Sequence, residues 1–389
     1  MRTVGVVTVG RSDYGIYLPL LRAIKADPDL QLHLFVSGMH LSPEYGLTVE
    51  DIEADGFEIT SRVEMLLSSD TPEGISKSMG MGALGFAQAY TNTRPDILVV
   101  LGDRFEMHAA ALAALPFKIP VAHIHGGEIT QGAIDDALRH SMTKLSHLHF
   151  VSTREYAQRV IQLGEEPWRV VVSGAPGLDN LAHTPLLTRE EFFTQFEIQW
   201  GDAPFLLVTY HPVTLEYERA EWQTAELLAA LEMVNLPVIF TQPNADTGGR
   251  VIAQMIADFV DAHPNAQLIN NLGTQGYFSV MAHAAAMIGN SSSGIIEAAS
   301  FELPVVNLGS RQAGRVRGAN VIDVDHPREA VLEGIRLALS PRFRTDLSGM
   351  KNPYSEGEAA QTIITALKQA QLDERLIVKH FYDLGGKTG

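Results

Sequence analysis

Short apolar runs rich in β-branched residues alternate with amphipathic helical stretches along most of the chain, and this alternation constrains the fold more than any other feature. Strands that alternate with helices predict right-handed βαβ units and parallel sheets. The runs are almost entirely apolar, as expected for strands that are buried on both faces. The predicted strands are Val4–Val9, Leu32–Val36, Ile97–Leu101, Val121–Ile124, Leu148–Val151, Val170–Val172, Leu206–Tyr210, Val238–Thr241, Leu268–Ile269, Met287–Gly289, Val305–Leu308 and Val321–Val324. The predicted helices of the first half are Tyr17–Ala26, Ile75–Tyr90, Glu106–Leu115, Asp135–Leu145 and Arg154–Leu163.

The alternation pauses near Asn180–Thr188, where the segment LAHTPLLT has the composition of a linker. At about 150 residues per domain, a chain of this length accommodates two domains. We therefore predict an α/β fold with two doubly wound, Rossmann-like domains that face a cleft. The first covers residues 1–180 and the second covers residues 181–355, while a C-terminal helix (Glu356–Glu374) and an irregular tail cover 356–389 and pack back on the first domain. Ligands of such sheets bind beyond the carboxyl ends of the strands.

The composition narrows the classes of partner. The net charge is −17, which disfavours nucleic acid and anionic lipid as partners. The chain has no cysteine, which excludes disulfides, thiolate catalysis and cysteine-bound zinc. The start, MRTVGVVTVGRSDYG, is not a signal peptide, and no apolar run reaches the roughly 18 residues of a membrane helix. We therefore expect a cytoplasmic protein that does not interact with membranes.

Two turns in the first half place charged residues directly after predicted strands. The turn Gly10–Gly15 combines glycines with Arg11 ahead of a predicted helix, an arrangement that attracts an anion through a guanidinium and backbone N–H groups. It does not match the GxGxxG fingerprint, and a capped turn is the alternative. The second turn contains Asp103 and Arg104, for which there are two interpretations. The two residues form an ion pair at a helix start, or Asp103 points into the cleft. We favour the cleft position for Asp103, because of where strand ends point in this architecture.

The segment HIHGGE at 123–128 brings two histidines close to Glu128. Strand alternation places His123 and His125 on one face, and further histidines nearby raise the alternative of a metal site. The nearby histidines are His140, His147 and His149. We disfavour a metal because the spacing matches no metalloprotease-type helix motif. The structural alternative is that His147 and His149 are strand residues with ordinary hydrogen bonds and that His123 is a core residue or supports the site from behind. Asp135 and Arg139 follow at i and i+4 of a predicted helix, where they either pair or line the cleft.

Polar residues also follow strands of the second half. They are His211, Asn244, Asp246 and the run Ser291–Ser293. Consecutive serines at a helix start offer hydroxyl and backbone N–H groups to a phosphate, and N-capping by one serine is the alternative. Glu297, one turn into that helix, is positioned to accept hydrogen bonds from ribose hydroxyls. Arg311, Arg315 and Arg317 share a glycine-rich loop that is either a counter-charge for a diphosphate or a solvated basic loop.

Taken in order, these motifs resemble the UDP-N-acetylglucosamine 2-epimerases, and in particular the hydrolysing branch that makes N-acetylmannosamine for sialic acid synthesis. The resemblance covers nearly the whole chain. It is carried by GRSDYG at 10–15, LGDRFE at 101–106, HIHGGE at 123–128, IDDALRHSMTKLSHLH at 134–149, YHPVT at 210–214, PNADTG at 243–248, GNSSSGIIE at 289–297 and RQAGRVRG at 311–318. A sister branch acts on UDP- or GDP-linked N,N'-diacetylbacillosamine for legionaminic acid, and the motifs do not separate the two.

The resemblance implies the two-domain glycosyltransferase-B arrangement and assigns site residues. The residues implied to bind the nucleotide and its diphosphate are Arg11, His211, Asn244, Asp246, Ser291, Ser292, Glu297 and Arg311. The residues implied to surround the sugar are Asp103, Glu128, Asp135 and Arg139. The resemblance further implies that some relatives carry a glutamate, a candidate catalytic acid or base, where this chain has His125. Either His125 or Glu128 then takes that role, or Asp103 and Asp135 suffice.

The implied reaction removes UDP from the sugar and inverts C2. Because the C2 proton is not acidic, UDP leaves from C1 as a carboxylate removes that proton, which gives a glycal. Water then adds at C1, and a second group protonates C2 from the opposite face. No cofactor or metal is required, and the resemblance implies a homodimer or homotetramer. A glycosyltransferase, a metal hydrolase and a nucleotide-sugar-binding protein without turnover are the alternatives.

Overall fold

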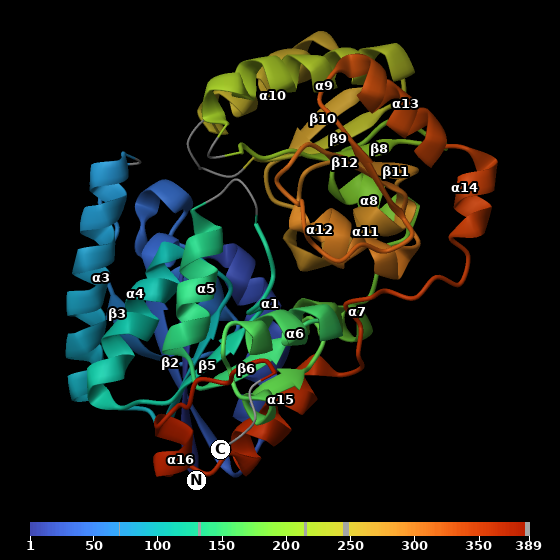
Figure 1. Cartoon of the computed structure of the whole chain (residues 1–389). Coiled ribbons are helices and arrows are strands. Elements are labelled where there is room, and N and C mark those ends of the chain that lie inside the picture. Colours follow the sequence, from blue (N-terminus) through green and yellow to red (C-terminus); the bar gives the residue numbers. More distant parts are fainter. Residues whose placement is uncertain (70, 131–133, 214–215, 244–248, 386–389) are drawn as a thin grey trace. The chain divides into compact units, whose positions relative to one another are not determined.

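The computed structural model of the chain describes residues 1–69, 71–130, 134–213, 216–243 and 249–385. It divides into two compact units (Figure 1). The first unit contains Met1–Glu128, Asp135–Asn180 and the C-terminal segment from Tyr354, and the second contains Leu181–Pro353. Ile129, Thr130 and Ile134 also group with the second unit, although a single boundary between residues 180 and 181 would assign them to the first.

The first unit is built on a parallel sheet of seven strands in the order β3-β2-β1-β4-β5-β6-β7. The strands are β1 (Arg2–Thr8), β2 (Leu30–Ser37), β3 (Ile59–Val63), β4 (Ile97–Leu101), β5 (Val121–Ile124), β6 (Leu148–Val151) and β7 (Val170–Val172). The strand order changes direction between the neighbours β1 and β4, and ligands of doubly wound sheets bind at the carboxyl ends of such a pair. Arg11 follows β1 and Asp103 follows β4, so both lie at this switch point.

Helices cover this sheet with their apolar sides. The α-helices of the unit are α1 (Arg11–Ala26), α2 (Val49–Ala54), α3 (Pro72–Asn92), α4 (Phe105–Ala114), α5 (Asp135–Leu145), α6 (Arg154–Gln162), α15 (Ala359–Gln369) and α16 (Glu374–Ile377). Helix α4 packs against α3 and α5, and α1 packs against α15. Buried side chains of β1, β2 and β4 form the core between these helix layers.

The second unit contains a parallel sheet of six strands in the order β10-β9-β8-β11-β12-β13. The strands are β8 (Leu206–Thr209), β9 (Val238–Thr241), β10 (Ala266–Ile269), β11 (Ala286–Gly289), β12 (Val305–Leu308) and β13 (Val321–Val324). The helices of this half are α7 (Asp179–His183) at its start, α8 (Arg189–Gln195), α9 (Ala220–Val234), α10 (Gly249–Ala262), α11 (Gly273–His283), α12 (Ser292–Ile296), α13 (Arg328–Ala338) and α14 (Pro341–Asp346). Leu206 and Val208 of β8 enter one apolar cluster and Leu207 enters another, because successive residues face opposite sides of a buried strand. The switch point here lies between β8 and β11.

The prediction of two parallel α/β sheets is confirmed, and all twelve predicted strands are present with small shifts at their ends. The prediction missed the short helix α2, and three further details were wrong. Strand β3 was missed because its sequence, ITSRV, is half polar and belongs to a sheet edge. Helix α1 begins at Arg11 and not at Tyr17. The single helix predicted over Glu356–Glu374 is replaced by α15 and by α16, which begins at the end of that range.

The C-terminal segment is fastened to the first unit through helix ends. Asp179 accepts hydrogen bonds from the backbone N–H groups of Ala359 and Ala360 at 3.1 and 2.7 Å, which caps the start of α15. Near the other end of α15, Lys368 lies 2.9 Å from Asp27 and 2.8 Å from Asp29. In Figure 1 the two helices of the segment, drawn in red, lie against the first unit.

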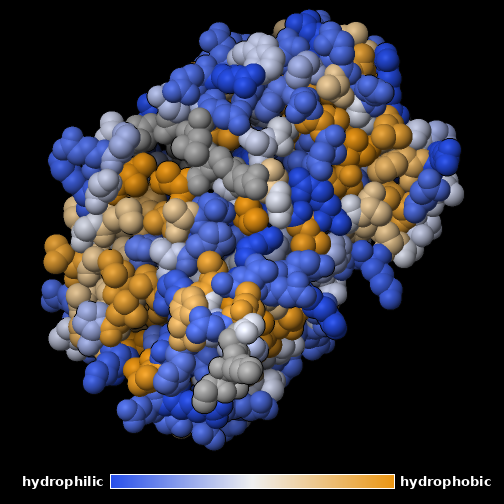
Figure 2. Space-filling view, viewed as in Figure 1, coloured by the Kyte–Doolittle hydropathy of each residue, from blue (hydrophilic) through white to orange (hydrophobic). Residues whose placement is uncertain are grey.

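The surface of the first unit carries apolar side chains over α3 and α4. Figure 2, viewed as in Figure 1, shows orange residues gathered on the left of the molecule, where these helices lie. Met81 and Leu84 of α3 and Leu112 of α4 are 43%, 76% and 44% exposed, which is high for large apolar residues. Within the described part of the chain, no helix is long and apolar enough to cross a membrane.

Candidate active site

Asp103 and Arg139 form an ion pair beside the carboxyl end of β4. All five residues of β4 are buried, and Gly102 after them has a φ of +74°, which glycine adopts without strain. Arg139 reaches Asp103 from α5, and its side chain is only 3% exposed. The pair fixes the carboxylate of Asp103 relative to α5. Arg104 in turn pairs with Glu106 at 3.2 Å.

Glu128 is the most enclosed carboxylate of this cluster. Its side chain is 2% exposed, and its Oε1 lies 2.6 Å from Nδ1 of His125. Ser152 donates a hydrogen bond to the same oxygen at 2.9 Å, and Arg139 lies 3.8 Å from Oε2. These contacts supply the hydrogen bonds that a buried carboxylate requires. Asp103, His125, Glu128 and Arg139 therefore form one polar cluster.

His125 has an unusual backbone conformation. Its φ is +63°, in the left-handed region that residues with a side chain rarely occupy. Arg139 donates to its carbonyl oxygen at 2.7 Å, and its own N–H donates to the Phe150 carbonyl at 3.0 Å. Non-glycine residues held in such a conformation cluster at functional sites. These bonds hold the turn that aims the imidazole at Glu128.

His123 has a different role from His125. Strand β5 ends at Ile124, so the alternation that was predicted to place both histidines on one face does not extend to His125. His123 Nε2 donates to the Gly102 carbonyl at 2.7 Å, and burial lowers the pKa of His123 to about 3, so its ring is neutral. His147 accepts from the Val121 N–H at 3.1 Å. Among the residues that the structure describes, no group of three His, Asp or Glu side chains is arranged to hold a metal ion.

The turn after β1 contains Arg11 and a carboxyl group that was not predicted, Asp13. Arg11 is the first residue of α1 and is exposed. Asp13 is buried and accepts hydrogen bonds from Thr8 Oγ1 at 2.6 Å and from the Val9 N–H at 3.0 Å. Burial raises the pKa of Asp13 to about 6, although both hydrogen bonds act to lower it. Asp135 is the half-buried first residue of α5, one turn before Arg139.

In the second unit, Asn290 binds the backbone of His211. The His211 N–H donates to Asn290 Oδ1 and Asn290 Nδ2 donates to the His211 carbonyl, both at 2.8 Å. Asn290 follows β11 and His211 follows β8, so this pair of bonds joins the two strands at the switch point. Burial, and then the nearby Arg311, lower the pKa of His211 to about 3, which leaves the imidazole neutral.

Hydroxyl groups form a network at the start of α12. Ser291 is the N-cap residue, and its Oγ lies 2.9 Å from Ser293 Oγ, which lies 2.5 Å from the Tyr277 hydroxyl. Burial raises the pKa of Tyr277 to about 12, so the phenol stays protonated. The N-capping alternative therefore applies to Ser291. Ser292 is the first residue of α12 and Glu297 lies at its C-terminal end.

The arginine loop after β12 contains side chains with different partners. Arg311 donates to the Asn290 carbonyl at 3.0 Å, and Gln312 donates to the same oxygen at 2.8 Å. Arg317 instead pairs with Asp323 at 2.6 Å. Arg311 therefore lies beside His211 and the serine turn. Asn244 and Asp246 lie outside the described residues.

Three residues of these hydrogen-bonded clusters were missed as functional candidates: the buried Ser152 and Asn290 and the partly buried Tyr277. Ser152 follows β6 directly, and Asn290 precedes the serine run in GNSSSG, so both had the strand-end position that selected other candidates. Tyr277 lies inside α11, where an aromatic residue is normally a core residue, and no sequence signal distinguishes it.

Comparison with known proteins gives the family. A model of the UDP-N-acetylglucosamine 2-epimerase family matches residues 22–368. The UDP-N,N'-diacetylbacillosamine 2-epimerase (hydrolyzing) of Legionella pneumophila is 39% identical over 97% of this chain and 99% of its own. The UDP-N-acetylglucosamine 2-epimerase of Neisseria meningitidis serogroup B is 31% identical over 89% of this chain and 90% of its own.

A solved structure gives the fold. The crystal structure of UDP-GlcNAc 2-epimerase from Neisseria meningitidis bound to UDP-GlcNAc has a TM-score of 0.82 at 18% identity, over 95% of this chain and all of that one. Two parallel α/β sheets of seven and six strands with this likeness define a glycosyltransferase-B-like fold. The chain belongs to the UDP-N-acetylglucosamine 2-epimerase family.

Proposed function

We propose that the protein is a hydrolysing 2-epimerase that converts a UDP-linked N-acetyl amino sugar and water into UDP and the free C2-inverted sugar. The observation that carries the proposal is the cluster of Asp103, His125, Glu128 and Arg139 at the carboxyl edge of the first sheet. In this proposal the cluster supplies two acid/base centres, because one centre must remove a proton from one face of C2 and another must return a proton to the opposite face.

In this proposal the first centre is Asp103. Its carboxylate removes the C2 proton while UDP leaves from C1, and the ion pair with Arg139 orients it. The second centre is the pair of His125 and Glu128. Glu128 forms a hydrogen bond with Nδ1 of the imidazole at 2.6 Å, as a carboxylate does when it orients a histidine base. Nε2 of His125 is then the atom that exchanges a proton with C2. His125 then replaces the glutamate that some relatives carry. Asp135 is proposed to line the sugar.

We propose that the second unit binds the nucleotide. Arg311 and the N–H groups at the serine turn supply positive potential for the diphosphate, and the developing charge on the leaving group is stabilised by such fixed donors. Burial keeps the imidazole of His211 neutral, so it acts as a hydrogen-bonding group and not as a charge. We propose that Ser291, Ser292 and Glu297 bind the phosphate and ribose groups of the nucleotide. Arg11, which lies in the first unit, is also a proposed nucleotide-binding residue. Asn244 and Asp246 remain proposals for the same ligand.

The identity of the sugar is the finer part of the proposal. We favour a UDP-linked 2,4-diacetamido sugar of the N,N'-diacetylbacillosamine type, because relatives with that substrate in their names reach 39% identity over nearly the full chain. UDP-N-acetylglucosamine is the second candidate, supported by the 31% identical relative from Neisseria meningitidis. A product with an inverted N-acetyl group fits the synthesis of sialic acid-type sugars.

The test is to incubate the purified protein with each nucleotide sugar in D2O containing EDTA and to follow the sugar by proton NMR. Release of UDP with a free, C2-deuterated, inverted sugar supports hydrolysing epimerisation, and the ratio of kcat/KM values ranks the two substrates. Binding of UDP without release from either nucleotide sugar would support the non-catalytic alternative. Turnover only when an acceptor is added would support a glycosyltransferase.

We also propose that the protein is a cytoplasmic homodimer or homotetramer that binds neither nucleic acid nor membranes. The exposed apolar side chains on α3 and α4 support self-association, because monomers seldom expose several such residues together. Light scattering on the wild type and on Leu84→Glu tests this, and an unchanged oligomer in the variant would place the interface elsewhere. The lack of cysteine suits a reducing compartment.

A further inference from the structure

Besides Lys368, two further cations fasten the C-terminal segment, and the first of them is Arg169. Its side chain is fully buried and donates to the carbonyl oxygens of Arg375, Leu376 and Val378 at 2.8, 2.8 and 3.1 Å. These carbonyls lie at the end of α16, where a helix leaves them without internal partners. The arginine therefore fixes the position of the chain that leads into Lys379.

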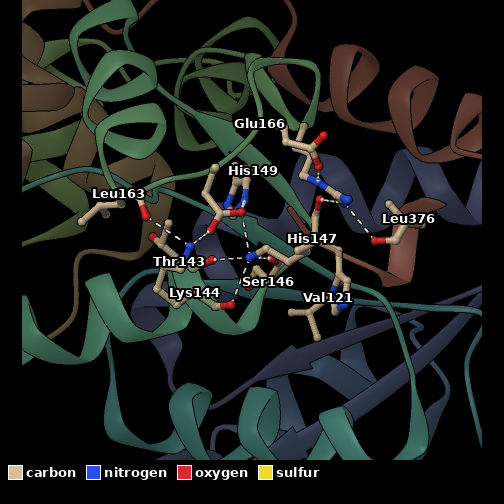
Figure 3. Close-up of polar contacts among 12 residues, drawn as sticks. Val121, Thr143, Lys144, Ser146, His147, His149, Leu163, Glu166 and Leu376 are labelled. Carbon is tan, nitrogen blue, oxygen red and sulfur yellow. Dashed lines mark hydrogen bonds and ion pairs between the residues drawn. The ribbon is translucent and has the colours of Figure 1, made fainter. Parts of the chain in front are cut away.

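The second cation is Lys379, which reaches a buried carboxylate. Its Nζ lies 2.7 Å from Oε2 of Glu165 and donates to the carbonyl oxygens of Ser146 and Lys144 at 2.5 and 3.0 Å. Figure 3 labels Lys144, Ser146, His147 and His149 in a close-up of the polar contacts in this region. The side chain of Lys379 is 17% exposed, and that of Glu165 is completely buried. Burial lowers the pKa of Lys379 to about 8, although the bond to Glu165 acts to raise it.

Glu165 connects this contact to the middle of the sheet. Besides Lys379, it binds Lys144 at 2.5 Å and Nε2 of His149 at 3.1 Å. Burial acts to raise the pKa of Glu165, but the hydrogen bonds from His149, Lys144 and Lys379 outweigh it and hold the pKa at about 2. A buried carboxylate that loses one of its donors is left with an incompletely compensated charge, which the surrounding groups must rearrange to satisfy.

His149 lies beside His123 in the sheet. The two are register partners in β6 and β5, so their side chains project from the same face. His123 donates to the Gly102 carbonyl at 2.7 Å, and the Gly102 N–H donates to the Ile124 carbonyl at 2.9 Å. Both backbone polar groups of Gly102 are thus bound by β5 and its histidine. The next residue is Asp103.

We propose that Lys379, Glu165, His149 and His123 form a buried relay through which the C-terminal segment positions the Gly102–Asp103 turn. Lys379 is then a positioning residue of the reaction, although it contacts residues that precede β6, whereas Asp103 follows the carboxyl end of β4. The inference rests on the proposed function, in which Asp103 acts on C2. It gives the C-terminal segment a part in catalysis beyond its contribution to folding.

The relay depends on the charge of Lys379, so it predicts a pH dependence. The charged or titratable groups that face Lys379 are Glu165, Lys144, Arg169, His147 and His149. Burial lowers the pKa values of both histidines, so they are neutral near pH 8, and the group that changes charge there is Lys379. Below its pKa of about 8 the lysine compensates Glu165, and above that pH it does not. The relay is therefore intact at pH values below about 8 and is lost above it.

The test compares Lys379→Met, Lys379→Arg and the control Lys368→Met in the full-length protein. Lys368 also fastens the C-terminal segment, but through Asp27 and Asp29, away from the relay. For Lys379→Met we expect kcat to fall roughly 10- to 100-fold with KM within about two-fold, as for a displaced catalytic group. Lys368→Met should keep kcat within about two-fold even where it lowers the melting temperature equally. Lys379→Arg should keep activity to higher pH than the wild type, because arginine does not lose its charge.

Equal kcat values for Lys379→Met and Lys368→Met below both melting temperatures would overturn the relay, as would identical alkaline profiles for the wild type and Lys379→Arg. Hydrogen exchange separates this failure from a failure of the proposed function, because it needs no substrate. We expect the amides of Gly102 and of Val121–Ile124 to exchange faster in Lys379→Met than in Lys368→Met. If they exchange at the same rate in both variants, the relay is wrong whatever the substrate is.

Discussion

Nδ1 of His125 lies 2.6 Å from Oε1 of Glu128, and both side chains are almost completely buried. The Ser152 hydroxyl donates a hydrogen bond to the same oxygen at 2.9 Å. A buried carboxylate in this position fixes both the orientation and the tautomer of the neighbouring imidazole. This chain therefore presents an imidazole with a carboxylate behind it.

Replacing Glu128 with glutamine keeps the size of the side chain and removes its charge. We expect kcat to fall about 100- to 10,000-fold, the range of a lost acid/base contribution. Ser152→Ala is the matched control, because it removes one hydrogen bond to the same oxygen and leaves the charge; its kcat should fall about ten-fold or less. UDP release under saturating substrate measures both. If the kcat of Glu128→Gln stays within ten-fold of the wild-type value, the pair of His125 and Glu128 does not act as an acid/base centre.

Asp103→Asn and Asp135→Asn test the carboxylates around the sugar. We expect each to lower kcat by about 100-fold or more, with Asp103→Asn the more severe because Asp103 is paired with the buried Arg139. Loss of deuterium incorporation at C2 in D2O would show that the proton-transfer step is affected. The elimination mechanism does not survive if both variants keep near-wild-type turnover.

Tyr277→Phe removes only the hydroxyl that lies 2.5 Å from Ser293. Because a neutral hydrogen bond contributes about 0.5–1.5 kcal/mol net, we expect the Kd for UDP to rise about 2- to 12-fold. Calorimetric titration of UDP into the variant and the wild type measures this change. Tyr217→Phe is the control, since Tyr217 is exposed and lies in a different segment. If the wild type and both variants bind UDP with equal affinity, the hydroxyl network does not contribute to nucleotide binding.

Asn290→Ala breaks two hydrogen bonds to the backbone of His211 and leaves a buried N–H and a buried carbonyl without their partner. At about 1–3 kcal/mol for each such group, we expect the free energy of unfolding of the second unit to fall by about 2 kcal/mol or more. Urea unfolding followed by tryptophan fluorescence measures it, because Trp200 and Trp222 lie in this unit. A loss below about half of that value would mean that water replaces the side chain.

Asp13 makes stability depend on pH. Its pKa is raised from the ordinary 3.8 to about 6 in the folded protein, so the folded state binds more protons than the unfolded state between these values. Stability therefore falls as the pH rises from about 4 to about 6, by up to roughly 3 kcal/mol at 1.36 kcal/mol per pKa unit. Asp13→Asn should abolish this slope and be the more stable protein at pH 7. Parallel stability profiles for the two proteins would contradict the assignment.

The sequence predicted most of the fold because the periodicity of buried strands and amphipathic helices is a local property. It failed where local patterns are weak. The polar edge strand β3 carries no apolar run, and the first turns of α1 have no side-chain cap. The predicted helix over Glu356–Glu374 had suitable composition throughout, but the chain breaks it near its end. Helix propensity alone does not locate such breaks, because packing decides them.

The candidate site could be proposed from the sequence where a polar residue closely follows a buried strand, as for Asp103, His211 and the serine run. It was not predictable where a residue acts through a partner. Tyr277 lies inside a helix, and only the contact with Ser293 separates it from a core aromatic residue. Ser152, at the end of a strand, likewise becomes a candidate only through its hydrogen bond to Glu128, which lies 24 residues away in the sequence.

The sequence by itself determined most of the strands and helices and most of the polar side chains at the carboxyl ends of the strands, because each follows from residues close together in the chain. The tertiary structure alone decided which of these side chains meet. Asp103 pairs with Arg139 across 36 residues, and Lys379 reaches Glu165 only because the C-terminal segment packs on the first unit. The physical reason is that such contacts depend on strand order and helix packing, which are set by the burial of the whole core and not by any single segment.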